Sequence, residues 1–177
     1  MSTWYEVVSG TDLEQGDLFF GCEVPVPRLD LSTQSPTATI EMQTRDVIVL
    51  TQSCDLMNGK ALFVFVCQVL RLPDLEAVPN QKLGEFFRQK NNKEKIRRGE
   101  VVGYHMLASC LLDGFQQPIL IVDFREINSL PFDYLRQVAT TSQRRLRLMS
   151  PYREHLSQAF ARMFMRVGLP ADIPPFT

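Results

Sequence analysis

The chain has 177 residues, of which 45% are hydrophobic and 22% are charged, and its net charge is −1 at neutral pH. This length predicts a single domain over residues 1–177 with a sizeable core, and this composition excludes a wholly disordered chain. No apolar run reaches the ~18 residues that a membrane-spanning helix needs, so we expect no membrane contact.

The first residues, Met1-Ser-Thr-Trp-Tyr-Glu, contain neither the basic nor the apolar segment of a signal peptide, which predicts a cytoplasmic protein. The four cysteines are then expected to be free thiols, because disulfides are rare in that compartment. The sequence has no CxxC and no HxxxH pair, the spacings typical of zinc ligands. We therefore expect no metal and no cofactor.

Charge is distributed unevenly along the chain. Residues 1–80 hold 11 acidic and 4 basic side chains, whereas residues 81–177 hold 9 acidic and 15 basic ones. Two explanations stay open at this stage. Either the two halves attract each other, or the second half carries a basic binding face.

The N-terminal part predicts three strands. A turn at Gly16-Asp17 precedes the first, over residues 18–20. Residues 46–51 form a β-branched run without alternation, which is typical of a central strand covered on both faces. A third strand over residues 62–69 follows the turn signal Asn58-Gly59, and we expect these last two strands to form an antiparallel pair.

Residues 22–44 are rich in proline, serine and threonine. Pro25, Pro27 and Pro36 lack the backbone donors that a β-ladder uses. We therefore expect an extended loop, with at most a short edge strand over residues 38–42. A loop of this length inside a compact domain is usually functional or mobile, so it is a candidate contact surface.

The second half begins with an insertion at about residues 73–100. It combines a short apolar stripe with an almost entirely polar stretch, which predicts one or two helices and a solvated basic segment. Strands are expected over residues 101–108 and 118–124, on either side of a turn at Asp113-Gly114, followed by a helical turn over residues 131–137.

The clearest element is a C-terminal amphipathic helix at about residues 151–167. Ser150 can cap it, Pro151 suits its first position, and Gly168 and Pro170 can end it. Apolar residues recur at helical spacing, and we expect four of them to be buried: Leu156, Phe160, Phe164 and Val167. Together the elements predict an α+β fold, a small, strongly bent antiparallel β-barrel closed by this helix.

Three segments follow a family pattern: Gly16-Asp17-Leu-Phe, Arg45-Asp-Val-Ile-Val-Leu-Thr51 and Ile121-Val-Asp-Phe-Arg-Glu-Ile-Asn128. In this order they resemble the PemK/MazF-like group, whose members are small SH3-like barrels and in many cases toxin ribonucleases. The resemblance covers about half the chain and implies a catalytic role for Arg45. Gln68-Val69-Leu70 stands where the family usually has a threonine, so ribonuclease activity is left open.

Further segments, Leu50-Thr-Gln-Ser-Cys-Asp55 and Ser150-Pro-Tyr-Arg-Glu-His-Leu-Ser157 through Phe164-Met-Arg-Val-Gly-Leu-Pro170, are similar to a set of uncharacterised bacterial proteins. This similarity carries no activity with it. It implies a bacterial accessory protein that is encoded with a larger system.

Cys54 and Asp55 stand just past the expected central strand, where a rigid scaffold can present functional side chains. A cysteine nucleophile needs a base, and His105 is the candidate, because the other histidine lies on the terminal helix. This pattern predicts a thiol site with Cys54, Asp55 and His105 as catalytic residues. The alternative is that Cys54 is a small buried residue and that Asp55 accepts backbone N–H groups in a turn.

The basic stretch of the insertion predicts contacts with phosphate groups. The candidate nucleic-acid ligands are Arg45, Lys90, Lys93, Lys95, Arg97 and Arg98. Phe86, Phe87 and Tyr104 are candidate stacking partners for bases. The basic cluster at residues 144–147 would add to this surface if it shared the same face. The alternative is a solvated helix or loop without a ligand.

Three functions follow from these patterns. The leading one is a nucleic-acid-binding barrel with RNA as partner, part of a bacterial toxin-like or defence-type system. The second is a non-catalytic interaction module that binds a partner protein encoded nearby, and the third is a thiol enzyme. Whether the chain is an enzyme stays open, and so does its oligomeric state, with a dimer compatible with all three.

Overall fold

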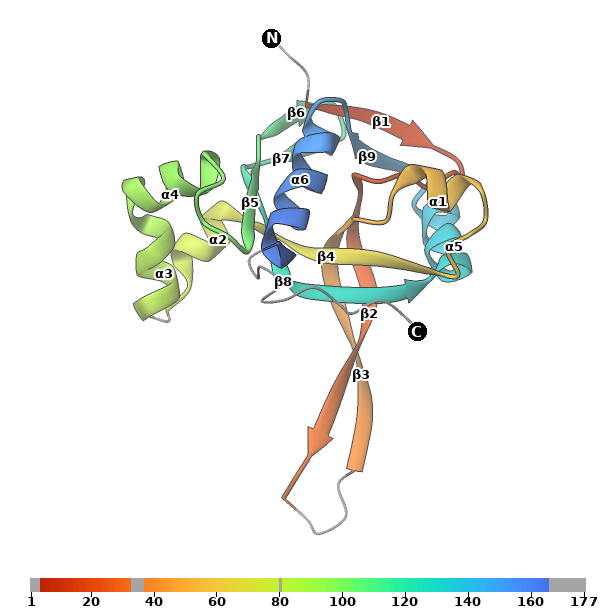
Figure 1. Cartoon of the computed structure of the whole chain (residues 1–177), viewed down its shortest axis with the longest axis horizontal. Coiled ribbons are helices and arrows are strands. Elements are labelled where there is room, and N and C mark those ends of the chain that lie inside the picture. Colours follow the sequence, from red (N-terminus) through yellow and green to blue (C-terminus); the bar gives the residue numbers. More distant parts are fainter. Residues whose placement is uncertain (1–3, 33–36, 80, 166–177) are drawn as a thin grey trace, which may run out of the picture.

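The computed structural model describes residues 4–32, 37–79 and 81–165. Its largest element is an antiparallel sheet of seven strands in the order β1-β9-β2-β3-β4-β8-β5, and β6 and β7 form a separate hairpin (Figure 1). The strands are β1 Tyr5–Ser9, β2 Asp17–Asp30, β3 Thr37–Val49, β4 Phe63–Arg71, β5 Tyr104–Leu107, β6 Cys110–Leu112, β7 Phe115–Gln117, β8 Leu120–Pro131 and β9 Arg144–Leu148. The helices are α1 Ser53–Met57, α2 Leu72–Ala77, α3 Gln81–Arg88, α4 Lys90–Arg97, α5 Phe132–Ser142 and α6 Tyr152–Phe164. The expected α+β class and its antiparallel sheet are confirmed.

The sheet is strongly bent but not closed into a barrel (Figure 1). Within the described residues its two edge strands, β1 and β5, do not pair with each other. A side chain joins them instead, because the Tyr5 hydroxyl donates to the carbonyl of Ala108 at 2.6 Å. The bend lets a single core touch the whole sheet, so closure by a β-ladder is not needed to bury it.

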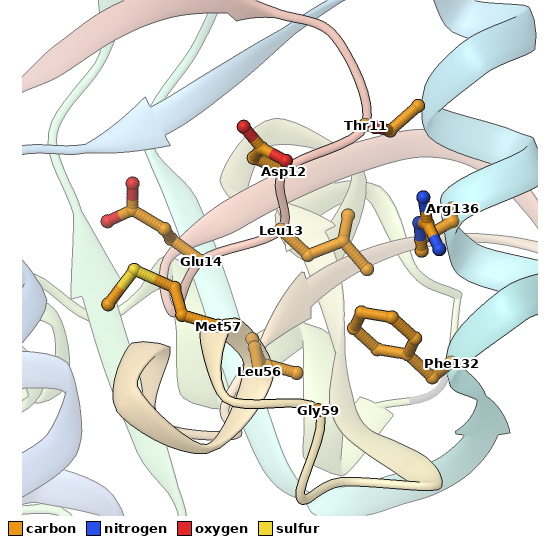
Figure 2. A pocket seen from close by; sticks show the side chains of 9 residues that line it. All are labelled: Thr11, Asp12, Leu13, Glu14, Leu56, Met57, Gly59, Phe132 and Arg136. Atoms are coloured by element: carbon orange, nitrogen blue, oxygen red, sulfur yellow. The ribbon is translucent and has the colours of Figure 1, made fainter.

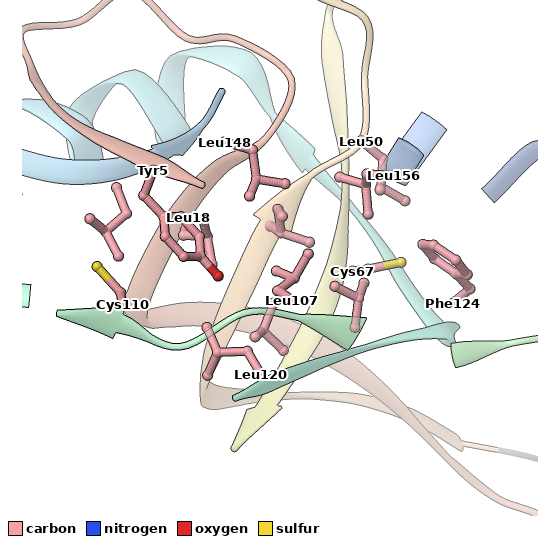
Figure 3. Close-up of a cluster of buried hydrophobic side chains, with 14 residues drawn as sticks. Tyr5, Leu18, Leu50, Cys67, Leu107, Cys110, Leu120, Phe124, Leu148 and Leu156 are labelled. Carbon is pink, nitrogen blue, oxygen red and sulfur yellow. The ribbon is translucent and has the colours of Figure 1, made fainter. Parts of the chain in front are cut away.

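The larger core lies on one face of the sheet, under α6 (Figure 3). All seven strands contribute a buried side chain to it, and α6 contributes Leu156. A second core lies on the opposite face, where α1 and α5 pack with Leu56 and Leu135. Residues 47–49 of β3 supply both cores and are 0% exposed, which confirms the central strand expected from its unbroken apolar run.

A third core belongs to the insertion. Helices α2, α3 and α4 pack through Leu75, Phe87 and Ile96 against Ile121 of β8 and Tyr104 of β5. These aromatic residues therefore build the interior of the insertion. Phe87 is 0% exposed, so it is not a stacking platform for bases, and the expectation that Phe87 binds nucleic acid is wrong.

The expectation of an extended loop over residues 22–44 is also wrong. β2 and β3 continue there as a two-stranded ribbon that projects from the body, and we call its residues 24–30 and 37–43 the arm (Figure 1). The expected short strand over residues 38–42 is part of β3. Pro25 and Pro27 are tolerated because each arm strand has a free edge, where a missing N–H costs no ladder bond.

A β-bulge separates the arm from the body. The register of β2 on β3 shifts between Phe19 and Cys22, and Gly21 has a φ of 73°, a conformation that favours glycine. Its N–H donates to the carboxylate of Asp46 at 2.9 Å. The bulge therefore fixes the direction in which the arm leaves the sheet.

The basic cluster at residues 144–147 lies in β9, a strand that the sequence did not predict. Arg145 and Arg147 are buried and both contact the carboxylate of Asp17, which is 0% exposed. Glu14 joins them through Arg147 and also pairs with Arg153 of α6 at 2.7 Å. Arg145 and Arg147 are thus internal ion-pair partners and do not extend a basic surface.

Helix α6 confirms the main C-terminal prediction and corrects its ends. Leu156 is fully buried and Phe160 is partly buried, with its ring 5.5 Å from that of Phe124. Phe164 is 60% exposed, so the expectation that it is buried is wrong. The expected burial of Val167, and the expected stop signals after it, lie outside the described residues. Within the described part of the chain, no helix has the length and hydropathy to cross a bilayer.

Candidate anion-binding site

The residues that the sequence singled out are spread over three places. Cys54 and Asp55 lie on α1, Arg45 lies on β3, and His105 lies on β5 beside the end of α4. Only the last place brings together residues from different predicted sites.

Cys54 lies on the short helix α1 and is exposed, so the expectation of a small buried residue is wrong for it. Its Sγ lies 3.7 Å from Oε1 of Gln52 and 3.9 Å from Oδ1 of Asp55. Helix α1 and strand β5 lie on opposite sides of the body in Figure 1. The structure therefore does not bring Cys54 and His105 together as a nucleophile and its base.

A pocket of about 490 Å³ lies next to α1 (Figure 2). Its floor is apolar, with Leu13, Leu56 and Phe132, and its rim carries Asp12 and Glu14 on one side and Arg136 on the other. The Glu14 carboxylate is already paired with two arginines. An acidic rim repels a phosphate backbone, so this pocket does not suit a nucleic acid.

Arg45 lines a second pocket, of about 270 Å³, that has mixed charge. Its guanidinium donates to Oε1 of Gln43 at 2.8 Å and to Oε2 of Glu126 at 3.1 Å. Asp46 and Asp74 line the same pocket. Arg45 would have to exchange these partners before it could contact a phosphate group.

The third pocket, of about 260 Å³, gathers cationic and imidazole side chains from three elements. Figure 1 shows β5 between α4 and α6, and the end of α4, β5 and α6 all line it. We call it the Arg/His pocket, and its lining residues are Arg97, Arg98, Gly99, His105, His155, Gln158, Ala159 and Arg162. Three guanidinium groups thus surround one cavity that no acidic side chain of the described residues lines.

The acidic neighbours of these arginines lie outside the pocket. Arg97 pairs with Glu94 at 2.9 Å, while Arg98 lies 3.9 Å from both Glu94 and Glu100. These side chains are 41–61% exposed, and ion pairs of that kind contribute little to stability. The arginines can therefore turn to a bound anion at low cost.

Backbone geometry brings the two helices close at this point. Helix α4 ends with the N–H groups of Gly99 and Glu100 bound to the carbonyls of Ile96 and Lys95, both at 2.9 Å. Gly99 has a φ of 70°, and a Cβ at this position would lie 3.7 Å from Nη1 of Arg162. The chain reversal thus sets the arginines of α4 beside the last turn of α6.

His105 supplies a group that lacks a partner inside the protein. Its Nε2 is buried and makes no hydrogen bond among the described residues, while its ring stacks on Phe124 at a centroid distance of 6.3 Å. Burial, and then the nearby His155, lower the pKa of His105 to about 4. A neutral imidazole with one free nitrogen can donate a hydrogen bond to an anion, or accept one from the protonated form of that anion.

This burial predicts a pH-dependent stability. In the unfolded chain His105 takes up a proton near pH 6.5, but in the folded chain only near pH 4. Between these values the unfolded state binds more protons, so the free energy of unfolding should decrease as the pH is lowered from about 6.5 to about 4, by about 3 kcal/mol in total. Urea unfolding of the wild type and of His105→Gln across this range measures the difference. Identical pH profiles for the two proteins would contradict the prediction.

The other predicted ligands lie further from the pocket. Lys93 is paired with Glu76 at 2.6 Å, and Lys90 and Lys95 are exposed on α4 without lining the pocket. Sequence reasoning missed His155 and Arg162. Their spacing of seven residues places them on one face of α6. In the sequence alone this spacing indicates only a polar helix face, because it does not show which element packs beside that face.

Comparisons with protein-family models, with curated proteins and with solved structures give no match for this chain. Its own geometry must therefore carry the functional argument. Within the described residues, no group of histidine, cysteine and carboxylate side chains is placed to hold a metal ion. The Arg/His pocket remains the place where three arginines and a histidine with an unpaired ring nitrogen converge.

Proposed function

We propose that this protein binds RNA and that the Arg/His pocket holds one phosphate group of the RNA backbone. The observation that supports this most is the convergence of Arg97, Arg98 and Arg162 on one cavity that His105, whose Nε2 lacks a hydrogen-bond partner among the described residues, also lines. Like charges repel one another, so three guanidinium groups around a cavity favour a bound anion.

The size of the pocket supports a phosphate group over a larger ligand. Its volume of about 260 Å³ is below the roughly 300–1,000 Å³ of pockets that enclose whole small molecules. Arginine offers a planar fork of donors that matches phosphate oxygens. Lys90 and Lys95, which are exposed on the same helix as Arg97, extend the positive charge along which a backbone can run.

The finer parts of this proposal come from the sequence resemblance. The bent sheet is compatible with an SH3-like ancestry, and we propose a PemK/MazF-like protein of a bacterial toxin-like or defence-type system, active in the cytoplasm. Whether it also cuts RNA depends on Arg45, whose guanidinium is held by Gln43 and Glu126. Incubation with mixed RNA, with Arg45→Ala as the comparison, tests that part separately.

RNA binding should show the salt dependence of about three phosphate contacts. For a single strand this means a slope of about −2 for log Kobs against log salt concentration. Replacing Arg98 and Arg162 together by alanine should weaken binding about tenfold or more at low salt and reduce the slope by about 0.7, the contribution of the one phosphate held in the pocket. Fluorescence anisotropy of a labelled RNA oligonucleotide measures both quantities.

Arg136→Ala is the matched control for this experiment. It removes the same charge from an exposed arginine of α5, which lines the acidic pocket and not the Arg/His pocket. Its affinity and slope should equal those of the wild type. Failure of the wild type to bind RNA at low salt would overturn the proposal. Equal losses of affinity in the double variant and in Arg136→Ala would also overturn it, because they would show a general effect of charge and no specific site.

The second function, a protein-interaction module, is supported by a different feature. The arm exposes large apolar side chains, among them Leu29 and Ile40. The ligand of such a module is an apolar protein surface.

A further inference from the structure

The arm sorts its side chains into two chemically different faces. In an antiparallel ladder, directly opposite residues point to the same face and successive residues alternate. One face is made only of apolar residues, from the pairs Pro25↔Met42, Pro27↔Ile40 and Leu29↔Ala38, and we call it the apolar face. The other carries the charged residues of the arm, Arg28, Asp30 and Glu41. This division is typical of a ribbon with one side in contact with protein.

Nothing in the described part of the chain covers the apolar face. Leu29 is 68% exposed, Ile40 73% and Met42 54%. The charged face needs no partner, since Arg28 and Glu41 bind each other at 2.8 Å in water. A two-stranded ribbon is marginally stable alone, and the apolar side of an antiparallel sheet is normally the packed side. The arm therefore has the composition of an interface element.

A second apolar surface, on the body, is also left uncovered by the described residues. Phe63 and Phe65 alternate along β4 with Val64 and Val66, which belong to the second core, so both aromatic rings point to the other face, that of α6, and both are more than half exposed. Leu62 precedes them, and Pro131 pairs with Phe63 in the register of β8. We call these four residues the body patch. Polar side chains are expected where part of a sheet face meets water.

One chain cannot cover its own body patch with its own arm. The arm continues β2 and β3 and extends away from β4 and β8 (Figure 1). We propose that the protein forms a two-fold dimer in which each chain lays the apolar face of its arm on the body patch of the other.

The area of the two surfaces fits this arrangement. A standard interface buries about 800 Å² on each partner, with about 56–65% of it apolar, which is about 450–520 Å². An aliphatic side chain can bury about 60–120 Å² and an aromatic one about 150–250 Å². Six large exposed residues are available, three on the arm and three on the body patch: Leu29, Ile40, Met42, Leu62, Phe63 and Phe65. Together they provide on the order of 500 Å² of apolar area. The arm alone supplies about half of that, so an interface needs both surfaces. In a two-fold dimer each chain contributes one arm and one body patch, so every one of these surfaces is covered.

Prolines favour contact through the face of the arm. Pro25 and Pro27 interrupt the backbone donors of β2, so an added strand would find an incomplete edge there. The apolar face, in contrast, gains from both prolines, since their rings point to that side with Met42 and Ile40. The charged face then stays in water when the dimer forms.

Light scattering coupled to size-exclusion chromatography of the full chain tests the dimer. The wild type should have about twice the chain mass of 20.3 kDa. Ile40→Glu on the apolar face and Phe65→Glu on the body patch should each weaken association by at least about thirtyfold. Thr39→Glu adds the same charge to the opposite face of the arm and should remain dimeric. Circular dichroism of each variant verifies folding.

Cross-linking checks the arrangement without relying on charged variants. In a Cys54→Ser background, Ile40→Cys together with Phe63→Cys should yield covalent dimers on mild oxidation. Thr39→Cys with Phe63→Cys should yield far fewer. A monomeric wild type at every concentration would overturn the proposal, as would a dimer that is insensitive to Phe65→Glu and does not cross-link. These outcomes are independent of RNA binding at the Arg/His pocket.

Discussion

Replacing Asp17 by alanine should lower the free energy of unfolding by about 3–5 kcal/mol. Asp17 is 0% exposed, and its carboxylate accepts from Nε of Arg145 at 2.8 Å and from Nη2 of Arg147 at 3.1 Å. Removal of the carboxylate leaves the buried guanidinium of Arg145 without an anion and leaves Arg147 with Glu14 alone, and an uncompensated buried charge carries a large desolvation cost. Urea denaturation followed by circular dichroism measures the loss.

Two comparisons separate the ion cluster from general packing. Glu14→Gln removes a partly exposed partner of Arg147 and should cost at most about 1 kcal/mol. Replacing Asp17, Arg145 and Arg147 together by apolar residues of similar volume should cost less than Asp17→Ala alone, because no unpaired charge remains. A loss below about 1 kcal/mol for Asp17→Ala would mean that water reaches the arginines.

The ion cluster also shows why β9 was not found in the sequence. The run Arg144-Arg145-Leu-Arg147 has the composition of an exposed basic segment, and three residues of this kind predict solvent contact. Their partner, Asp17, lies 128 residues before Arg145. Carbonyls of Gly10 and Asp12 supply further acceptors to both arginines. Burial of a charged strand depends on such distant partners, which no local pattern reveals.

Segments whose burial follows from local pattern were predicted correctly. The unbroken apolar run of residues 46–51 becomes the central β3, and the run over residues 62–69 becomes most of β4, paired with it antiparallel. The arm was not predicted as strands because of its prolines. A proline argues against a strand only when both edges of that strand are paired. The sequence cannot tell a free edge from a paired one, so residues 22–44 were assigned to a loop.

The Arg/His pocket was predictable only in pieces. Arg97, Arg98 and His105 were candidates, but for two separate sites, because the basic stretch and the histidine have different local patterns. His155 and Arg162 complete the pocket from a helix that packs beside β5 only in the folded chain. The convergence is therefore a property of topology, and all residues of the pocket come from the second, more basic half of the chain.

Leu156→Ala should lower the free energy of unfolding by about 2–5 kcal/mol, the range for a large aliphatic side chain removed from a core. Leu156 is the α6 residue that enters the larger core, and it is 0% exposed (Figure 3). A helix of 13 residues is marginal by itself in water, so this contact holds α6 on the sheet.

Phe164→Ala is the matched control on the same helix. Phe164 is 60% exposed and its ring meets that of Phe160 at 5.1 Å, so its loss should cost less than about 1 kcal/mol. Because α6 also carries His155 and Arg162, Leu156→Ala should weaken RNA binding along with stability, whereas Phe164→Ala should leave both nearly unchanged. Equal losses of stability in the two variants would mean that α6 docks through its exposed aromatic end, and the Arg/His pocket would then lose the rigid support on which its geometry depends.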